Sequence, residues 1–390
     1  MTRYIIVLLL LLMTIELQAQ ERLSVNGFIS QGVQRASNTN FVNDDGDVSF
    51  NLTEIGVNGR YFINNRLTAN GQVVYLNADQ RYPEGFRVDY LFLDWHWVRQ
   101  QDFNVNVHIG RYKNYHWLYS ATRDVPHTRS TNLLPQSIYF DSFRDVALGS
   151  DGIALRMNQS SAFGEWEANW SYGRSPIDAD STRQLLGQMA TGDIEQDFVH
   201  QASVYWRSYD SGLLLGANLL DSDFVYNSGV NDPFIDGAAN VRRVSLVAQY
   251  QTQFWEFTSE VMREGSQYQD ALFNGFFSDS IAEGGYVQVT YMPNATLSAV
   301  VSLDVYDLNR EDRSGNELEL LSGGAIPARF GYMDTLTTGV RYALQDNLKL
   351  HVEYSRVKGA GRLTPLLVRS PSAAPEEYWN MWSIQLMYWF

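Results

Sequence analysis

Few residues of this 390-residue chain have types and spacing that could do covalent chemistry. There is no cysteine, which excludes thiolate nucleophiles, thiolate metal sites and disulfides. No Gly-x-Ser-x-Gly segment is present, so the nucleophile turn of many serine hydrolases is missing. Three of the six histidines, His108, His116 and His127, lie within twenty residues. Their spacing fits no metal-ligand motif, so we predict polar side chains here and neither a metal site nor a cofactor.

A second group of candidate residues carries charge. The polar segment from 113 to 148 contains four basic and three acidic side chains of interest: Lys113, Arg123, Arg129, Arg144, Asp124, Asp141 and Asp145. Opposed charges of this kind could line a water-filled passage, order its water and set its ion preference. They could equally pair with one another and only hold the segment in place.

Two pairs of carboxylates share strand faces, because alternate residues of an extended chain point the same way. These pairs are Glu165 with Glu167, and Glu256 with Glu260, the latter four residues apart. Paired carboxylates can do acid–base work. Inside a wet passage we expect them to shape cation preference instead.

The elements that must position these residues are strands. Leu297, Val301 and Val305 share one face of an extended segment, and Ser298, Ser302 and Asp304 share the other. The segment 348–355 alternates in the same way. A period of two predicts strands with unlike faces, and no convincing 3.6-residue period follows the N-terminal region.

Short and long connections alternate along the chain. Seven short connections rich in Asn, Asp, Gln, Ser or Pro are predicted as tight turns. Eight long polar segments separate them, near 34–48, 77–86, 113–148, 173–196, 221–240, 264–283, 307–332 and 359–377. Seven turns and eight loops join sixteen strands, the pattern of a membrane barrel with an even strand number.

The N-terminal residues indicate export. Arg3 precedes an apolar run from Tyr4 to Met13, and Ala19 offers a small residue for cleavage. The run is too short to span a bilayer, which needs about 20 apolar residues. We predict residues 1–19 as a signal peptide and residues 20–390 as the mature protein.

Alternation alone does not say which face meets water, so other features must separate a membrane barrel from a soluble sandwich. The predicted strands run about ten residues, the length that crosses a bilayer when tilted. Aromatic residues gather at the strand ends, as in an interfacial girdle. We therefore expect an all-β fold, a transmembrane antiparallel up-and-down β-barrel of about sixteen strands. A formal charge of −15 also argues against a nucleic-acid partner.

The last predicted strand carries a specific resemblance. Its residues on one face are hydrophobic, and the sequence ends on the last of them: Trp382, Ile384, Leu386, Tyr388 and Phe390. This pattern resembles the C-terminal insertion signal of Gram-negative outer-membrane porins, which barrel-assembly machinery reads. The likeness of plan covers residues 20–390 and implies an integral protein of the cell outer membrane.

The porin resemblance implies passive diffusion of small hydrophilic solutes and ions through a water-filled channel. It also implies a homotrimer surrounded by lipid and lipopolysaccharide. In that family the loop after the fifth strand folds inward and narrows the pore, and here that loop is the segment 113–148. Its charged residues named above are then the expected constriction. Five strand residues could form the facing wall: Arg60, Arg156, Arg207, Arg243 and Arg341.

Three other interpretations stay open. A substrate-selective channel for a sugar, phosphate or organic acid would share all these features, and the segment 113–148 is rich in aromatic residues. An outer-membrane barrel enzyme is less well supported because no catalytic motif is evident, so we expect no enzymatic activity. A soluble secreted β-protein would show the same alternation with its apolar face packed inside.

Overall fold

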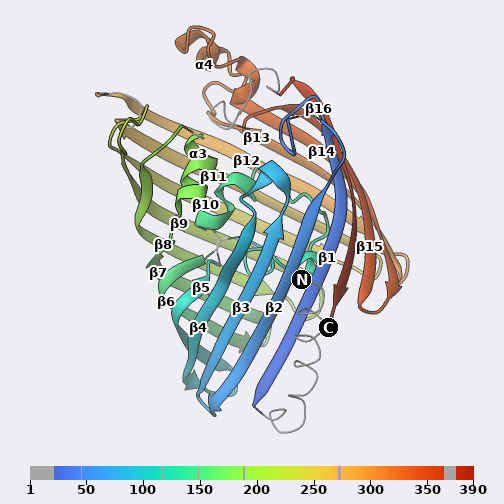
Figure 1. Cartoon of the computed structure of the whole chain (residues 1–390). Coiled ribbons are helices and arrows are strands. Elements are labelled where there is room, and N and C mark those ends of the chain that lie inside the picture. Colours follow the sequence, from blue (N-terminus) through green and yellow to red (C-terminus); the bar gives the residue numbers. More distant parts are fainter. Residues whose placement is uncertain are drawn as a thin grey trace, which may run out of the picture.

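The computed structural model describes residues 22–390 except 45, 116, 148, 188, 271–273 and 364–374. Within these residues, sixteen strands close into one barrel (Figure 1), and every strand pairs antiparallel with its neighbours in sequence. The first strand pairs with the last and closes the cylinder. The predicted fold class is therefore confirmed. The predicted signal peptide, residues 1–19, lies outside the described residues.

The strands are β1 (Leu23–Ser37), β2 (Ser49–Asn64), β3 (Leu67–Asn77), β4 (Gly85–Arg99), β5 (Phe103–Lys113), β6 (Gly149–Ser161), β7 (Gly164–Arg174), β8 (Asp193–Arg207), β9 (Leu213–Asn227), β10 (Gly237–Gln251), β11 (Trp255–Asp270), β12 (Phe277–Tyr291), β13 (Leu297–Asp307), β14 (Tyr332–Gln345), β15 (Leu348–Gly359) and β16 (Tyr378–Trp389). The short helices are η1 (Asp79–Arg81), η2 (Pro126–Thr128), η3 (Asp141–Phe143), α2 (Arg144–Ala147), α3 (Ala179–Leu186), α4 (Asn316–Leu321) and η4 (Ala328–Gly331). Among the described residues, no helix has both the length and the apolar character needed to cross a membrane.

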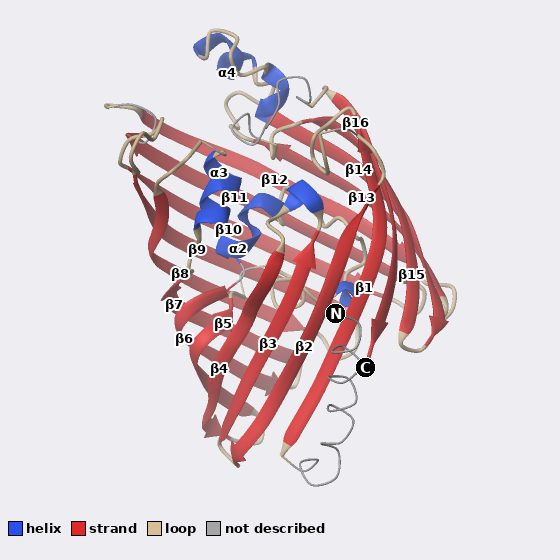
Figure 2. Cartoon of the chain, in the orientation of Figure 1, coloured by secondary structure: helices blue, strands red, loops and turns tan. Residues whose placement is uncertain are grey.

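The alternation of connections is also confirmed. Along the described chain, seven short turns lie between strands at one end of the barrel and eight longer segments lie at the other. Figure 2 shows the longer loops together at one end, with α4 projecting beyond the rim. The longest connection is the segment 114–148 between β5 and β6.

Several strands are longer than the ten residues expected. The segments near 221–240 and 264–283 were predicted as loops, but β9 extends to Asn227 and β11 to Asp270. Their polar ends continue the ladder and bond across it, since the Asn240 amide donates to Asp223 at 2.5 Å. Backbone pairing does not require apolar side chains. The strands therefore continue into the polar segments that were predicted as loops.

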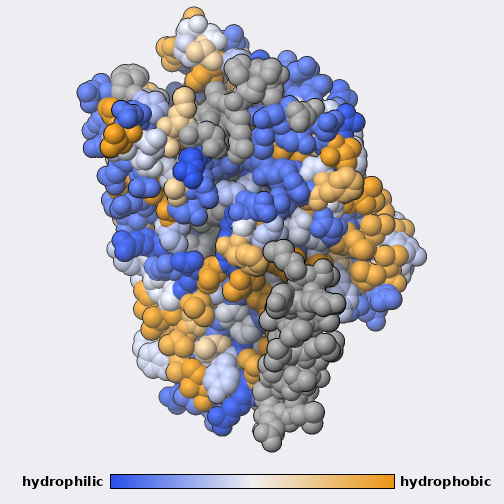
Figure 3. Space-filling model, in the orientation of Figure 1, coloured by the Kyte–Doolittle hydropathy of each residue, from blue (hydrophilic) through white to orange (hydrophobic). Residues whose placement is uncertain are grey.

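Burial separates the two faces of the barrel wall. On β13, Leu303 and Val305 are 59% and 55% exposed, whereas Ser302 and Asp304 are 3% and 5% exposed. On β16, Ile384, Leu386 and Tyr388 are exposed on the outside, as is Phe390, which follows the strand. Apolar side chains therefore point outward and polar ones inward, the inverse of a soluble sandwich and the arrangement of a barrel in lipid. Figure 3 shows hydrophobic residues gathered over the outer wall, below a hydrophilic loop end.

Aromatic side chains form the predicted girdle near the short turns. The exposed members come from strands around the barrel: Tyr61, Trp97, Trp166, Tyr250, Trp255, Tyr291, Tyr342 and Tyr388. Rings with one polar end suit the level of the lipid headgroups. The girdle places the short-turn end of the barrel near one membrane surface.

A hydrophobic cluster fills part of the barrel interior. Trp117 and Tyr139 of the segment 114–148 pack in it with Met262 and Tyr286 of the inner wall. Trp379 of β16 belongs to the same cluster and is fully buried. Part of the interior is thus packed with side chains, which confines any open passage to the remainder.

Candidate functional site

Carboxylates on the inner wall accept hydrogen bonds from the segment 114–148. Glu353 on β15 accepts from the backbone N–H groups of Asn132 at 2.6 Å and Leu133 at 2.9 Å. Asp304 on β13 accepts from the Ser137 N–H at 3.2 Å. A charged acceptor makes these bonds stronger than bonds between neutral groups. They hold the middle of the segment against β13 and β15.

A third inner-wall carboxylate, Glu260 on β11, binds the two ends of the same segment. Its Oε2 accepts from the Leu118 N–H at 3.1 Å, and its Oε1 accepts from the hydroxyls of Tyr139 and Tyr286. Burial and the neighbouring Glu260 raise the pKa of Tyr139 well above its ordinary value. The tyrosine therefore stays a hydrogen-bond donor at any physiological pH.

Charged residues of the segment also pair with the wall and with one another. Asp141 accepts from Arg81 and from Arg123, each at 2.9 Å, and all three side chains are buried. Burial alone would raise the pKa of Asp141, but Arg81 and Arg123 outweigh it and hold the pKa below its usual range. This carboxyl is ionised and bridges two guanidinium groups.

A second buried network lies beside the first. Asp124 pairs with Lys113 at 3.0 Å and with Arg144, and Lys113 also pairs with Asp89 on β4. Burial opposes the charge of Asp124, but Arg144 and Lys113 lower its pKa well below the usual value. On the same side of the barrel, Arg129 donates to Glu54 of β2 at 2.6 Å.

Six of the seven charged residues predicted for the constriction are therefore paired and buried. Only Lys113 among them also lines the large cavity described below. The side chain of Asp145 lies outside the described part of the structure. The partners of these six charges named above belong to the segment itself and to β2, β4, β5 and the β3–β4 connection.

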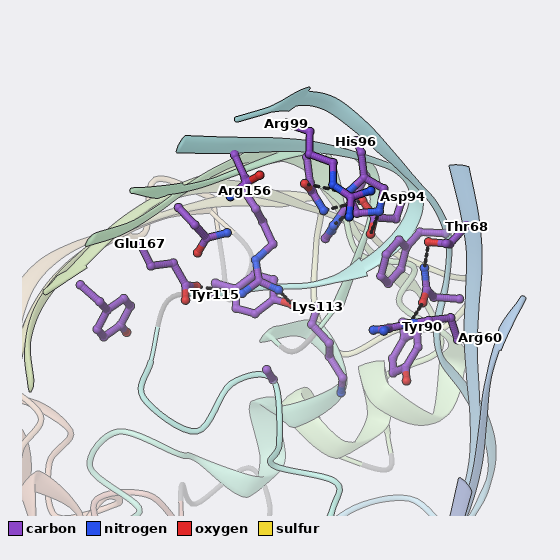
Figure 4. A pocket seen from close by; sticks show the side chains of 18 of the residues that line it. Arg60, Thr68, Tyr90, Asp94, His96, Arg99, Lys113, Tyr115, Arg156 and Glu167 are labelled. Atoms are coloured by element: carbon purple, nitrogen blue, oxygen red, sulfur yellow. Dashed lines mark hydrogen bonds and ion pairs between the residues drawn. The ribbon is translucent and has the colours of Figure 1, made fainter. Parts of the chain in front are cut away.

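The main cavity has a volume of about 1600 Å³ and lies between the segment 114–148 and strands β2 to β9 (Figure 4). Its lining includes Ile63 and Asn64 at the end of β2 and Asn65 of the β2–β3 connection, so it reaches the short-turn end of the barrel. A cavity of this size accepts hydrated ions and small organic molecules, since ligand sites span about 300–1,000 Å³.

Basic side chains outnumber acidic ones in this cavity. Its described lining contains six basic residues, Arg22, Arg60, Arg99, Lys113, Arg156 and Arg207. It contains three carboxylates, Asp94, Glu165 and Glu167. Arg156 pairs with Glu167 at 2.9 Å and stacks on the Tyr115 ring at 4.2 Å. The described lining therefore carries an excess of three positive charges.

The five arginines predicted for the facing wall do not share one site. Arg60, Arg156 and Arg207 line the large cavity. Arg243 pairs with Glu264 and lies 5.0 Å from the Trp117 ring, and Arg341 lines a separate, smaller cavity. The structure therefore brings three of the five together.

Sequence reasoning missed Arg99 and the polar group at Asp94 and His96. Asp94 and His96 could have been predicted to point inward, because they alternate along β4 with Trp95 and Trp97, which are exposed on the outside. Beyond it the β4–β5 register shifts between His96 and Val98, and the alternation no longer says where Arg99 points.

The histidines occupy separate surroundings. His108 on β5 stacks on Phe92 at 4.4 Å, and its Nε2 lies 3.5 Å from Asp94. His127 stacks on Trp389, while His116 lies outside the described residues. Across the described ranges, no three His, Asp or Glu side chains converge as metal ligands.

Of the two predicted carboxylate pairs, one stays together and the other separates. Glu165 and Glu167 both line the large cavity, where Glu167 pairs with Arg156. Glu256 lines the smaller cavity, whereas Glu260 holds the segment 114–148. In each pair, one carboxylate is held by protein partners: Glu167 by Arg156, and Glu260 by the segment 114–148.

The fold resembles those of several solved outer-membrane proteins. An anion-selective porin from Comamonas acidovorans matches with a TM-score of 0.59 and 12% identity, covering 94% of this chain and 99% of that one. OprB from Pseudomonas putida matches with a TM-score of 0.59 and 10% identity, covering 95% of each chain. OmpT, an outer membrane protein of Vibrio cholerae in trimer form, matches with a TM-score of 0.56 and 14% identity, covering 94% of this chain and 99% of that one.

No protein-family model matches the sequence, and neither does any curated protein. Similarity at these low identities is similarity of fold, and it extends over nearly the whole of each chain. The barrel closure, the strand number and the outward apolar wall agree with it. This chain therefore has the sixteen-stranded fold of the Gram-negative outer-membrane porins.

Proposed function

We propose that this protein is an outer-membrane porin, a water-filled channel through which small hydrophilic solutes and ions diffuse passively. The observation that carries the proposal is a polar cavity of about 1600 Å³ inside a closed barrel whose outer wall is apolar. Barrels of 16–18 strands are wide enough to leave an aqueous channel. The Comamonas neighbour is itself named as a porin, which favours transport over the outer-membrane enzyme that the sequence left open.

The channel prefers anions in this proposal. Among the described residues, Arg60, Arg99 and Arg207 line the cavity without forming an ion pair, and Arg22 does so as well. Unpaired guanidinium groups in a confined aqueous passage raise the local concentration of anions. The net charge of −15 does not oppose this, because most of the acidic residues lie elsewhere.

The segment 114–148 narrows the channel in this proposal. Its bonds to β2, β11, β13 and β15 support a fixed position across the interior. Tyr115, Trp117, Leu118, Ala121 and Thr122 form the edge of the segment that faces the large cavity, next to Lys113 at the end of β5. The buried charges Arg123, Asp124, Arg129, Asp141 and Arg144 then set the channel width by holding this edge in place.

The proposed surroundings follow from the outer surface. Its apolar wall and aromatic girdle suit outer-membrane lipid, with lipopolysaccharide around the loop end. A homotrimer is supported by the trimer form of the Vibrio neighbour. Delivery by barrel-assembly machinery and removal of residues 1–19 by signal peptidase complete the proposal.

The selectivity is tested by the triple variant Arg60→Gln, Arg99→Gln and Arg207→Gln in planar bilayers under a KCl gradient. We expect a reversal potential of anion-preferring sign for the wild type, and a shift toward cations in the variant. Arg242→Gln is the matched control, because this arginine is 72% exposed near the loop end. An unchanged reversal potential in the triple variant would remove these arginines from the ion path.

A substrate-selective channel is the second candidate, and the aromatic lining favours it. Tyr90, Tyr115, Trp117 and Tyr205 line the same cavity as the unpaired arginines. Rings bind the apolar body of an organic anion while guanidinium groups bind its carboxylates. Saturable block of the single-channel current by one organic acid, at concentrations where chloride conducts freely, would support this candidate over general diffusion.

A further inference from the structure

A second cavity of about 290 Å³ lies across the interior from the first. The segment 114–148 contributes Tyr119, Thr128 and Ser130 to it, and strands β10 to β15 form the other side. Met292 of the β12–β13 connection also lines it, so it lies toward the short-turn end. The proposed ion path through the larger cavity does not use these residues.

Strand register brings three polar residues of this cavity into one row. Arg341 on β14 is the register partner of Ser298 on β13 and of His351 on β15. Directly paired residues on neighbouring strands point to the same face, here the inside of the barrel. Thr290 on β12 lines the same cavity from the adjacent strand.

Several polar atoms at this cavity are buried without a hydrogen-bond partner among the described residues. They are Nε and Nη2 of Arg341, both ring nitrogens of His351, the Tyr119 hydroxyl and the Thr290 hydroxyl. His351 is 0% exposed. A buried donor left unpaired costs about 1–3 kcal/mol, and a charged one costs more. His351 Nε2 lies 3.8 Å from Glu353, which is beyond hydrogen-bond distance, so the protein alone does not satisfy this group of polar atoms.

We propose that this cavity binds a small oxyanion, a carboxylate or phosphate group, between Arg341 and the hydroxyls of Tyr119 and Thr290. A guanidinium presents its N–H groups in a fork that matches two oxygens of one anion. Hydroxyl groups supply further donors, and the ring of His351 can supply another. The volume is just below the range of about 300–1,000 Å³ for ligand sites, which suits a small anion.

One carboxylate, Glu256, is part of the described lining and acts against an anion. It forms no ion pair with Arg341 among the described contacts. Like charges in one confined site repel, so removing the charge of Glu256 should strengthen binding of an anion. Glu256→Gln should therefore raise the affinity for an anion, whereas Arg341→Gln should lower it.

Calorimetric titration of inorganic phosphate into the folded, detergent-solubilised protein, in chloride buffer, tests the proposal. We expect saturable binding at one site per chain. Affinity should fall about tenfold or more in Arg341→Gln, since a charged hydrogen-bond donor is lost. It should rise in Glu256→Gln and stay unchanged in Arg242→Gln. Heat-modifiable migration on gels shows that each variant is folded.

Two further variants keep the test decisive. Thr290→Val removes one donor without changing charge or size, so it carries the test if Arg341→Gln does not fold; a loss of several-fold is expected. Arg207→Gln removes a guanidinium from the larger cavity instead. Absence of saturable binding, unchanged affinity in Thr290→Val, or loss in Arg207→Gln with retention in Arg341→Gln would each overturn the assignment.

Discussion

The buried charged side chains of the segment 114–148 described above pair with side chains of opposite charge, and this pairing holds the segment in position. Asp141 is the central example, because it bridges Arg81 of η1 and Arg123 of the segment. A buried ion pair contributes little net stability against an apolar replacement, but removing one partner leaves a charge without compensation. The network therefore specifies one position of the segment more than it adds stability.

Asp141→Asn should destabilise the protein by about 3–5 kcal/mol, because Arg81 and Arg123 would stay buried beside a neutral amide. The free energy of unfolding in lipid vesicles, from denaturant titration of tryptophan fluorescence, measures the effect. Asp180→Asn is the control, since the Asp180–Arg183 pair is exposed and of little value. Equal stability of the two variants would contradict the bridging role of Asp141.

The same carboxyl gives a pH prediction. Its pKa is depressed in the folded protein, so its contribution to stability is present above the unfolded pKa and is lost as pH falls through the lower folded value. The difference in unfolding free energy between wild type and Asp141→Asn should be constant above about pH 5 and shrink below about pH 4. A difference that grows on acidification would contradict the ionised bridge.

At the scale of elements, strands were predictable and their ends were not. A period of two, with turn residues at regular intervals, predicted all sixteen strands because the outer wall must be apolar throughout the membrane. The ends of β9 and β11 on the long-loop side were not predicted, because the strands continue there with polar side chains beyond the apolar wall. Asn240 and Asp223 form such a polar contact. The inward direction of Arg99 was not predicted, because the β4–β5 register shifts just before it.

The sequence predicted which charged residues belong to the candidate site, but it did not predict which residues they pair with. The sequence identified Lys113, Arg123 and Asp141 as a charged group in one long loop. It could not show that these residues bind Asp89, Arg81 and one another, since these partners lie on elements that only the closed barrel brings together. The small cavity at Arg341 was likewise invisible, because it forms between that loop and a distant part of the wall.

Glu353→Gln should loosen the segment 114–148 and raise the noise of the open-channel current several-fold. A glutamine keeps one acceptor oxygen but presents an amide to one of the two backbone N–H groups that Glu353 now binds. Single-channel recording measures the noise. Glu311→Gln is the control in an exposed loop position. Identical noise in wild type and Glu353→Gln would show that this anchor does not limit the motion.

Phe390→Ser should lower the amount of folded barrel in the outer membrane several-fold. Phe390 is exposed at the end of β16 and pairs through its backbone with Gly27, so the change leaves the ladder intact and removes the proposed recognition ring. Heat-modifiable protein in outer-membrane fractions is the measurement. Phe254→Ser changes another exposed aromatic at the same barrel end. Equal loss in both variants would remove any special role of Phe390.

Over the whole molecule, charge is divided by location. The seven long connections other than 114–148 contain fifteen acidic and seven basic residues, an excess of eight negative charges. The large cavity carries the opposite excess near the short turns. If the channel conducts anions as proposed, they pass an acidic loop end before they reach a basic interior, so net charge alone does not predict selectivity.

Apolar side chains face lipid around a polar interior, and we propose that this interior conducts ions. Single-channel recording of the purified wild-type protein in a planar bilayer tests this. We predict discrete conductance steps that increase in proportion to KCl concentration, as expected for ions in a wide aqueous passage. Folded protein that inserts into the bilayer and yields no steps would contradict the claim.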